Sequence, residues 1–486
     1  MLNRRGTHFS DQQRLPRRAP SADDTRTPAS QAMTLPYDAC IVGAGPHALS
    51  VLSAFWYNRK NAEEGKQASV CVIDPSGKWL SDWDAAFDSL GIDFLRSPAW
   101  AHPDATCQEA MVDFAQREGR MSEFKCVNFQ GTSLDRTMSS KSGSYFKNPS
   151  TKLFKDFCDS LIGSLPHDMV CGRVTDVQVM SDARGSGYLH EIIVEPSQRQ
   201  KIVAKHVVLS LGARGCPNIP ATFKSLINYG DCPRVVHSND SRGLAMLTSR
   251  IVKTDTVLVI GGGLSAAQAA LLAVRRGAHR TVLCSRRPLV SQHYDVPIEW
   301  MDDRLGVNQV RNRQRADRFY TLPPADRIAA CKSIRGGGSV PPDYMEALDL
   351  QVRAGHLELL VDSVSAAQPT NYSVTVDLDD GGAVTASYVI LATGWSTDCL
   401  QVPLLAKLAD RYRLPMKGGL PLLDEGLYWH ERISVVGAFA AGSLGPDAAN
   451  LLGARKGGAL VATCLSQYGT FYRKKKHVTD EFSLEL

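Results

Sequence analysis

Apolar and polar positions alternate along the chain in a way that separates short buried strands from longer amphipathic segments. Two apolar runs, in YDACIVGAG and DTVLVIGGG, each end in glycines and are followed by the helix-like stretches PHALSVLSAFWYNRK and LSAAQAALLAVRRG. Further short runs occur in SVCVID, HVVLSLG, RTVLCS, YVILATGW and RISVVGAFAAG. Strands that alternate with helices are typical of parallel sheets, so the pattern predicts an α/β protein with two Rossmann-like dinucleotide-binding domains.

The first of these strand–helix units carries the turn GAGPHA. In it, Gly43 permits the tight turn, Gly45 lets the backbone approach a pyrophosphate, and the small Ala48 allows close packing of helix on strand. Pro46 opens the helix, whose N-terminus is suited to bind phosphate. Asp74 ends the next strand, where a carboxylate can accept hydrogen bonds from ribose hydroxyls. We therefore predict a nucleotide site here.

The second unit repeats this pattern with the turn GGGLSA, which contains Gly261, Gly263 and Ser265. Its next strand ends in serine instead of an acid, and Arg286 and Arg287 follow. An acid would repel a 2′-phosphate, whereas arginines pair with it through charge-assisted hydrogen bonds. The sequence thus favours NADPH over NADH. The alternative is that both arginines only lie on a solvated loop.

Three other strands end in glycine-containing turns, at Gly212, Gly394 and Gly437. Each places flexible backbone at the carboxyl end of a strand, where parallel sheets bind their ligands. One such glycine is ordinary in a core strand, but three together favour a shared ligand site.

Composition narrows the class of protein further. Hydrophobic residues make up 43% and charged residues 22% of the 486, and the formal net charge is only +5, which gives no reason to expect nucleic acid. No apolar run is long enough for a membrane span. The 12 cysteines form no CxxC pair, which excludes dithiol chemistry and zinc-like ligand doublets, so we expect no metal and a reducing, cytoplasmic location.

Both ends of the chain read as tails, at residues 1–35 and 471–486. The first is rich in Arg, Ser, Thr and Pro without apolar periodicity. A mitochondrial transit peptide is the alternative, but Asp11, Asp23 and Asp24 count against it. The C-terminal run of Arg473 to Lys476 reads as a solvated tail, with a nuclear signal as its alternative.

The segments GAGPHALS, GGGLSAAQ and ILATGW together resemble the class B flavoprotein monooxygenases. The nearest resemblance is to their N-hydroxylating branch and to the OSGIN-like proteins, through IDPSGKWLSDWD, IDFLRSPAWAHPD, PSTKLFKDFC, RVVHSND and LGPDAANLLGAR, and it spans roughly residues 36–465. It implies FAD at the first turn and NADPH at the second. It also implies that Trp79, Trp83, Arg96 and Ser97 lie near the flavin ring. The last FAD-binding segment would bring Asp447 and Asn450 to the far edge of the flavin.

From these features we expect an FAD-binding domain at 36–215 and 376–470, with an NADPH-binding domain inserted at 216–375. The resemblance implies that NADPH reduces FAD and that a flavin hydroperoxide then oxygenates a nucleophilic nitrogen. No protein nucleophile is needed, and His237, His293 and Asp303 are weak candidates for proton handling. The stretch from Arg304 to Arg318 is expected to be a solvated helix face, and the glycines at 336–338 a mobile connection over the nicotinamide.

The sequence also departs from better-known members of the family. The Baeyer–Villiger fingerprint FxGxxxHxxxW is absent, and so is a recognisable segment for holding ornithine or lysine, in whose place stands SQHYDVPIEWMDDR. With Tyr294, Trp300 and Met301 nearby, we expect a sizeable amine or alkaloid-like substrate, as in secondary metabolism, together with O2. Alternatives are an ornithine- or lysine-type N-hydroxylase, an NADPH oxidase or reductase, and a redox-regulatory flavoprotein with little turnover. The expected partners include no nucleic acid and no membrane, and homo-oligomerisation is left open.

Overall fold

The computed structural model describes residues 35–61, 68–127, 146–181, 188–195, 200–212, 215–227, 233–301, 314 and 317–479. Its two parallel sheets belong to one compact unit that begins at Pro36. The predicted tail at 1–35 and the candidate Asp303 lie outside the described residues, apart from Leu35. Helix α13 (Leu451–Thr479) continues through the first half of the C-terminal tail predicted at 471–486, and residues 480–486 lie outside the described residues.

A six-stranded sheet forms the centre of what we call the first region. Its strand order is β20-β21-β9-β1-β2-β5, and all neighbours are parallel except β20, which runs antiparallel to β21. The strands are β1 (Ala39–Val42), β2 (Val70–Asp74), β5 (Asp168–Cys171), β9 (Val207–Leu209), β20 (Tyr428–His430) and β21 (Ile433–Val435).

Side chains of these strands point alternately to two different cores. Ile41, Val72 and Val208 pack against helices α1 (Pro46–Asn61) and α13 (Leu451–Thr479). Cys40 and Ile73, on the opposite face, contact a three-stranded antiparallel sheet. That sheet consists of β6 (Arg173–Ser181), β7 (Tyr188–Glu195) and β8 (Gln200–Ala204). The sheet is thus buried on both sides, which explains its continuous apolar runs.

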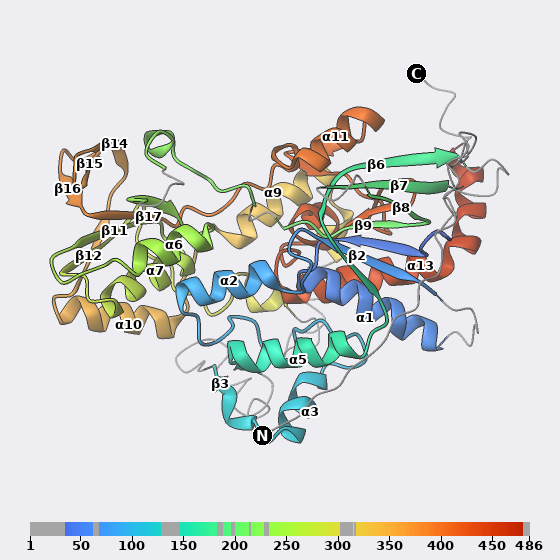
Figure 1. Cartoon of the computed structure of the whole chain (residues 1–486), viewed down its shortest axis with the longest axis horizontal. Helices are drawn as coiled ribbons and strands as arrows, with labels where there is room; N and C mark the ends of the chain where they lie inside the picture. Colours follow the sequence, from blue (N-terminus) through green and yellow to red (C-terminus); the bar gives the residue numbers. More distant parts are fainter. Residues whose placement is uncertain are drawn as a thin grey trace, which may run out of the picture. The chain divides into compact units, whose positions relative to one another are not determined.

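The second region is built in the same way around a five-stranded, fully parallel sheet in the order β10-β17-β11-β12-β13. One face packs on helices and the other on a second three-stranded antiparallel sheet, as Figure 1 shows. The parallel strands are β10 (Val235–His237), β11 (Thr256–Ile260), β12 (Arg280–Ser285), β13 (Leu357–Val361) and β17 (Tyr388–Leu391). Helices α6 (Ser241–Thr248), α7 (Leu264–Arg275) and α10 (Pro342–Arg353) cover one face, and β14 (Val364–Pro369), β15 (Val374–Leu378) and β16 (Ala383–Ala386) cover the other.

The other described helices and ribbons surround these two regions. Helix α2 contacts α6 and α7 of the second region, and α9 contacts α12. These elements are α2 (Ser81–Leu90), α3 (Ala110–Arg117), α5 (Thr151–Gly163), α9 (Pro324–Arg335), α11 (Pro403–Tyr412), α12 (Ala441–Leu444), and the ribbons β3–β4 (Phe124–Cys126, Lys147–Pro149) and β18–β19 (Met416–Lys417, Leu420–Pro421).

Two connecting segments join the regions and run side by side. Pro217 pairs with Trp395, the Asn218 amide donates to the Gly394 carbonyl at 3.0 Å, and the Ser396 amide donates to the Cys216 carbonyl at 2.7 Å. The return to the first region therefore follows Trp395. The expected boundary at 375/376 instead falls inside β15, and β17, expected in the FAD-binding domain, pairs with β11 in the second region.

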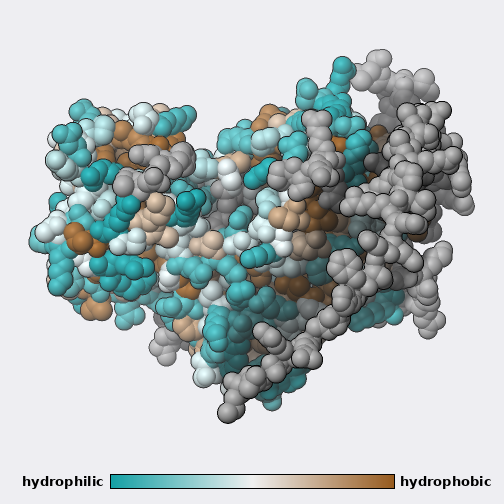
Figure 2. Space-filling view, viewed as in Figure 1, coloured by the Kyte–Doolittle hydropathy of each residue, from teal (hydrophilic) through white to brown (hydrophobic). Residues whose placement is uncertain are grey.

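The surface shown in Figure 2 is mainly hydrophilic, and its hydrophobic residues form small, separate patches. Among the described residues, no helix has both the length and the apolar character that a membrane crossing requires.

Candidate functional site

One large cavity opens between the carboxyl ends of the two parallel sheets. Its volume is about 2550 Å³, and both glycine turns line it. Pockets for one small molecule typically measure about 300–1,000 Å³, so this space can hold more than one ligand. Gly212, Gly394 and Gly437, the glycines that end the three other strands, line it too.

The first turn connects β1 to α1 through two glycines with different roles. Gly43 has a φ of +102°, and a side chain there would place its Cβ 2.5 Å from the Ser210 carbonyl oxygen. Gly45 faces the cavity, and no described atom lies within 4 Å of where its Cβ would be. The first glycine is therefore required by the fold, while the second leaves an open approach to the backbone at the start of a helix.

Asp74 completes this turn at the end of β2. Its carboxylate accepts hydrogen bonds from the Ala44 amide at 3.1 Å, and from the Ser76 amide and hydroxyl at 2.8 and 2.6 Å. Asp74 lines the cavity, as do Gly43, Gly45 and Pro46, whereas Ala48 is fully buried under the turn. The five predicted residues therefore lie together.

The second turn has the same backbone form but a different neighbour. Gly261, at a φ of +152°, leaves no room for a Cβ beside the Ala392 carbonyl oxygen, so it matches Gly43. Gly263, the N-cap of α7, is covered: a Cβ there would lie 3.1 Å from the Cα of Gly338. Gly261, Gly263 and Ser265 all line the cavity.

The arginines that follow β12 also line the cavity, and both are exposed. Arg287 donates from Nη2 to the Gly336 carbonyl at 2.5 Å and to the Gly338 carbonyl at 3.5 Å. Its own carbonyl accepts from the Ser285 hydroxyl at 2.7 Å. Arg286 makes no hydrogen bond or ion pair with the described residues. The glycine loop is thus attached to one of the two arginines.

The residues assigned by resemblance to the flavin divide into two sets. Trp83, Arg96, Ser97 and Asn450 line the cavity. Trp79 and Asp447 are not part of the described cavity lining. The indole N–H of Trp79 donates to His167 Nε2 at 2.9 Å. Burial raises the pKa of Asp447, and Lys456 partly offsets this through an ion pair of 2.6 Å.

Arg96 is a partly buried cation in the cavity wall. Its guanidinium donates to the backbone carbonyls of Gln292, His293 and Tyr294 and to the carbonyl and hydroxyl of Ser339, at 2.7–3.3 Å. Burial lowers the pKa of Arg96 to about 10, so it stays charged at neutral pH. Arg96 therefore joins the segment from Gln292 to Tyr294 to Ser339, the residue that follows the glycine loop.

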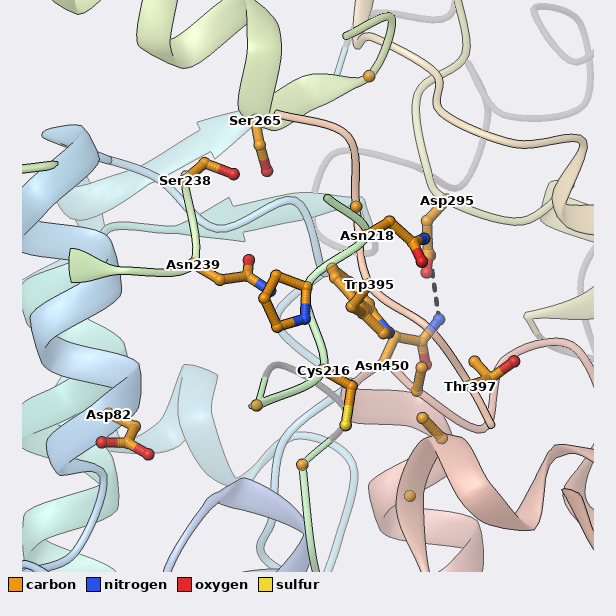
Figure 3. Close-up of a pocket in the computed structure, with 18 of the residues that line it drawn as sticks. Asp82, Cys216, Asn218, Ser238, Asn239, Ser265, Asp295, Trp395, Thr397 and Asn450 are labelled. Carbon is orange, nitrogen blue, oxygen red and sulfur yellow. Dashed lines mark hydrogen bonds between the residues drawn. The ribbon is translucent and has the colours of Figure 1, made fainter. Parts of the chain in front are cut away.

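A polar cluster lines the cavity, and Figure 3 shows two of its members, Asp295 and Asn450. Asp295 accepts from Asn450 Nδ2 at 3.1 Å and forms an ion pair with Arg335 at 2.9 Å. Arg335 also donates to the Pro446 carbonyl at 2.8 Å. Trp395 projects toward this cluster from the connecting segment, near Asn218.

The two candidates for proton handling that the structure describes, His237 and His293, lie outside this cavity lining. His237 is buried at the end of β10, where its Nδ1 accepts from the Asn239 amide at 3.1 Å. Burial lowers the pKa of His293, and only its backbone carbonyl meets Arg96. Neither side chain is part of the described cavity lining.

Sequence reasoning missed Asp295, Arg335 and His47 as cavity residues. Asp295 belongs to the segment SQHYDVPIEWMDDR, which was noted only because it lacks a recognisable pattern for binding ornithine or lysine. Arg335 directly precedes the three consecutive glycines. His47 follows Pro46, and its Nε2 lies 2.9 Å from the Ala448 carbonyl. Position within a glycine turn was the one available signal, and it could have found His47 but not Asp295 or Arg335.

Comparison with known proteins gives one matching family and many solved structures with a similar fold. The family described as L-lysine 6-monooxygenase/L-ornithine 5-monooxygenase matches residues 111–351. No curated protein sequence matches the chain.

Three solved structures illustrate the shared fold. An ornithine N-hydroxylase from Kutzneria sp. 744 is 16% identical, with a TM-score of 0.67 over 90% of this chain and 100% of that one. An ornithine hydroxylase from Pseudomonas aeruginosa is 19% identical, with a TM-score of 0.64 over 90% and 100%. An L-lysine 6-monooxygenase from Pseudomonas syringae is 19% identical, with a TM-score of 0.64 over 89% and 99%.

The predicted fold class, two Rossmann-like regions, is confirmed by the sheets and by these structures. The predicted enzyme class, a flavin-dependent monooxygenase, agrees with the description of the matched family. The match over residues 111–351 supports the resemblance found in the sequence to the N-hydroxylating branch of the class B flavoprotein monooxygenases.

Proposed function

We propose that this chain is an FAD- and NADPH-dependent monooxygenase that oxygenates an amine nitrogen. One observation carries the proposal: both glycine turns, each at the carboxyl end of a parallel sheet, open onto the same cavity of about 2550 Å³. That arrangement brings two dinucleotides together, and their reactive ends can then meet a substrate in the middle.

The residues of the first turn fit FAD. The open face of Gly45 admits a pyrophosphate next to the start of α1, and Asp74 adds carboxylate oxygens for a ribose. Trp83, Arg96 and Ser97 line the wall where the flavin ring is proposed to lie.

The residues of the second turn fit NADPH. Gly261 and Gly263 shape the backbone at the start of α7, whose N-cap has no side chain to satisfy the first amides of the helix. Arg286 and Arg287 stand where β12 ends and supply the positive charge that a 2′-phosphate requires.

When bound, FAD and NADPH supply the reductive activation of O2, and the residues of this chain bind, orient and enclose the reactants. Arg96 holds the backbone of Gln292 to Tyr294 in place. Because Asp295 is already paired with Arg335, this pair adds no net charge to the cavity wall. Such a site suits an amine that reacts in its neutral, nucleophilic form.

The substrate proposed here is a sizeable, weakly charged amine, oxidised to a hydroxylamine or further to a nitrone. Tyr294 and Met301 support this, because both line the cavity and both belong to an aromatic-rich core cluster with Phe146. Trp300 packs on the same cluster and against the Phe319 ring, with ring centroids 5.6 Å apart, but it is not part of the described cavity lining. Ornithine or lysine is the second candidate, favoured by the matched family.

The test compares hydroxylated product with hydrogen peroxide formed per NADPH consumed. The purified protein is given ornithine, lysine, and a panel of indole and piperazine amines. We expect coupled oxidation with at least one of the large amines. Coupling to ornithine or lysine alone would assign the second candidate, and peroxide with every amine unchanged would favour the oxidase or regulatory alternative.

A further inference from the structure

A loop covers the second turn, and among the described residues the first turn has no such cover. The loop is formed by Gly336, Gly337 and Gly338. A Cβ at Gly338 would lie 2.7 Å from the Cα and 2.9 Å from the amide nitrogen of Gly263. The loop backbone therefore rests on the glycine that a pyrophosphate must approach, whereas Gly45 has no described atom at that distance.

Arg287 is the residue that holds this loop. Its Nη2 donates to the carbonyls of Gly336 and Gly338. A Cβ at Gly337, whose φ is +83°, would lie 2.7 Å from the same Nη2, so the guanidinium lies directly against the loop backbone. Arg286, next in the chain and also exposed, makes no such contact with the described residues.

Both ends of the loop are anchored, which limits any movement to the three glycines. On one side, Arg335 ends α9 and is tied to Asp295 and to the Pro446 carbonyl. On the other side, Ser339 is held by Arg96, and the Val340 amide donates to the Val290 carbonyl at 2.9 Å. A change at Arg287 is therefore expected to move the loop without moving its flanks.

We propose that Arg287 couples coenzyme choice to the opening of the 336–338 loop, because it fastens this loop over the second turn until a 2′-phosphate draws its guanidinium away. The proposal rests on the NADPH site of the proposed function. A phosphate binds a guanidinium more strongly than a neutral carbonyl does, since both partners are charged. NADH has no group that competes for Arg287, so it must displace the loop unaided.

Three variants of the FAD-loaded protein separate this role from simple phosphate binding, with affinities for NADP⁺ and NAD⁺ measured by calorimetry. Arg286→Ala, the matched control, should weaken NADP⁺ by roughly tenfold or more and leave NAD⁺ unchanged. Arg287→Ala should weaken NADP⁺ and also tighten NAD⁺, on the order of threefold to tenfold, because the loop is released. Gly338→Ala should tighten both coenzymes, since its Cβ forces the loop off Gly263.

Hydrogen exchange of residues 335–340 gives a second readout. In the unmodified protein, 2′,5′-ADP should speed exchange in this segment and 5′-AMP should not, and in Arg287→Ala exchange should already be fast. If Gly338→Ala does not retain FAD, Arg287→Lys serves instead and should keep phosphate affinity while loosening the loop.

The outcomes distinguish the two proposals. Unchanged NAD⁺ affinity and unchanged exchange in Arg287→Ala, with NADP⁺ weakened, would overturn the loop mechanism and leave the NADPH site intact. Unchanged NADP⁺ affinity in both arginine variants would overturn the NADPH site. If the affinity for NAD⁺ still rose in Arg287→Ala in that case, control of the loop by Arg287 would remain supported.

Discussion

The two glycine turns of this protein have nearly the same backbone and opposite surroundings. Gly43 and Gly261 are both held at positive φ against a carbonyl of a neighbouring strand end. At the next glycine they diverge, because Gly45 is open to the cavity while Gly263 lies under Gly338. The same motif therefore describes one site ready for a ligand and another that must first be uncovered.

The difference has its origin outside both motifs. Each region repeats one plan, a parallel sheet between helices and a three-stranded antiparallel sheet. Among the described residues, only the second region has a glycine loop, at the end of α9, whose backbone reaches its turn. A shared fold thus sets where a dinucleotide binds, and a loop added between two helices sets how easily it enters.

The largest expected effect is a loss of folding stability when the first glycine of either turn is replaced, and this loss should be similar in the two turns. Gly43→Ala and Gly261→Ala each add a Cβ against a carbonyl oxygen at a positive φ. Each is expected to lower the free energy of unfolding by about 2–5 kcal/mol. Denaturant unfolding measures this, with Gly45→Ala as the control that should change little. A cost that is large in one turn and negligible in the other would show that the two backbones are not equivalent.

The next effect is on binding, and it should differ between the turns. Gly45→Val projects a side chain into the cavity without touching described atoms, so we expect a folded protein with less than about a tenth of the flavin. Flavin absorbance per chain and the thermal unfolding midpoint measure both properties. Gly263→Ala, its counterpart, should keep the flavin and lose coenzyme affinity. Full flavin content in Gly45→Val would make the assignment of FAD to the first turn wrong.

The smallest effect is a pH dependence of the first region, which buries His102. Its Nε2 lies 3.1 Å from the Gln108 carbonyl and its Nδ1 accepts from the Asp104 amide, so the ring is held neutral. Burial lowers the pKa of His102 to about 4, from about 6.5 in an unfolded chain. Between those values the unfolded chain binds more protons, so stability should fall as pH decreases from about 6.5 to 4, by about 2–3 kcal/mol.

Unfolding measured across this pH range checks the prediction on His102. The variant His102→Gln keeps a donor and an acceptor but cannot be protonated. It should therefore lose part of the pH dependence while remaining folded at neutral pH. A pH profile identical to that of the unmodified protein would mean that other groups, such as the buried His206, carry the effect.

Local sequence was sufficient to predict the elements that follow a regular strand–turn–helix pattern. Both turns, the strands that precede them, Asp74 and the two arginines lie where the patterns predicted, because a buried strand, a glycine turn and a helix are encoded by neighbouring residues. The second domain boundary could not be placed in this way. Apolar strand β17 reads the same in either sheet, and only its pairing with β11 assigns it to the second region.

The sequence by itself determined the fold class, the two dinucleotide turns and the positive charge beside the second. Tertiary structure alone decided that Asp295, Arg335 and Asn450 meet in the cavity, and that Trp79 points away from it. It also decided that the loop at 336–338 covers Gly263 and is attached to Arg287. These contacts join residues far apart in the chain, and no local periodicity or propensity encodes which distant backbone will fill the space above a glycine.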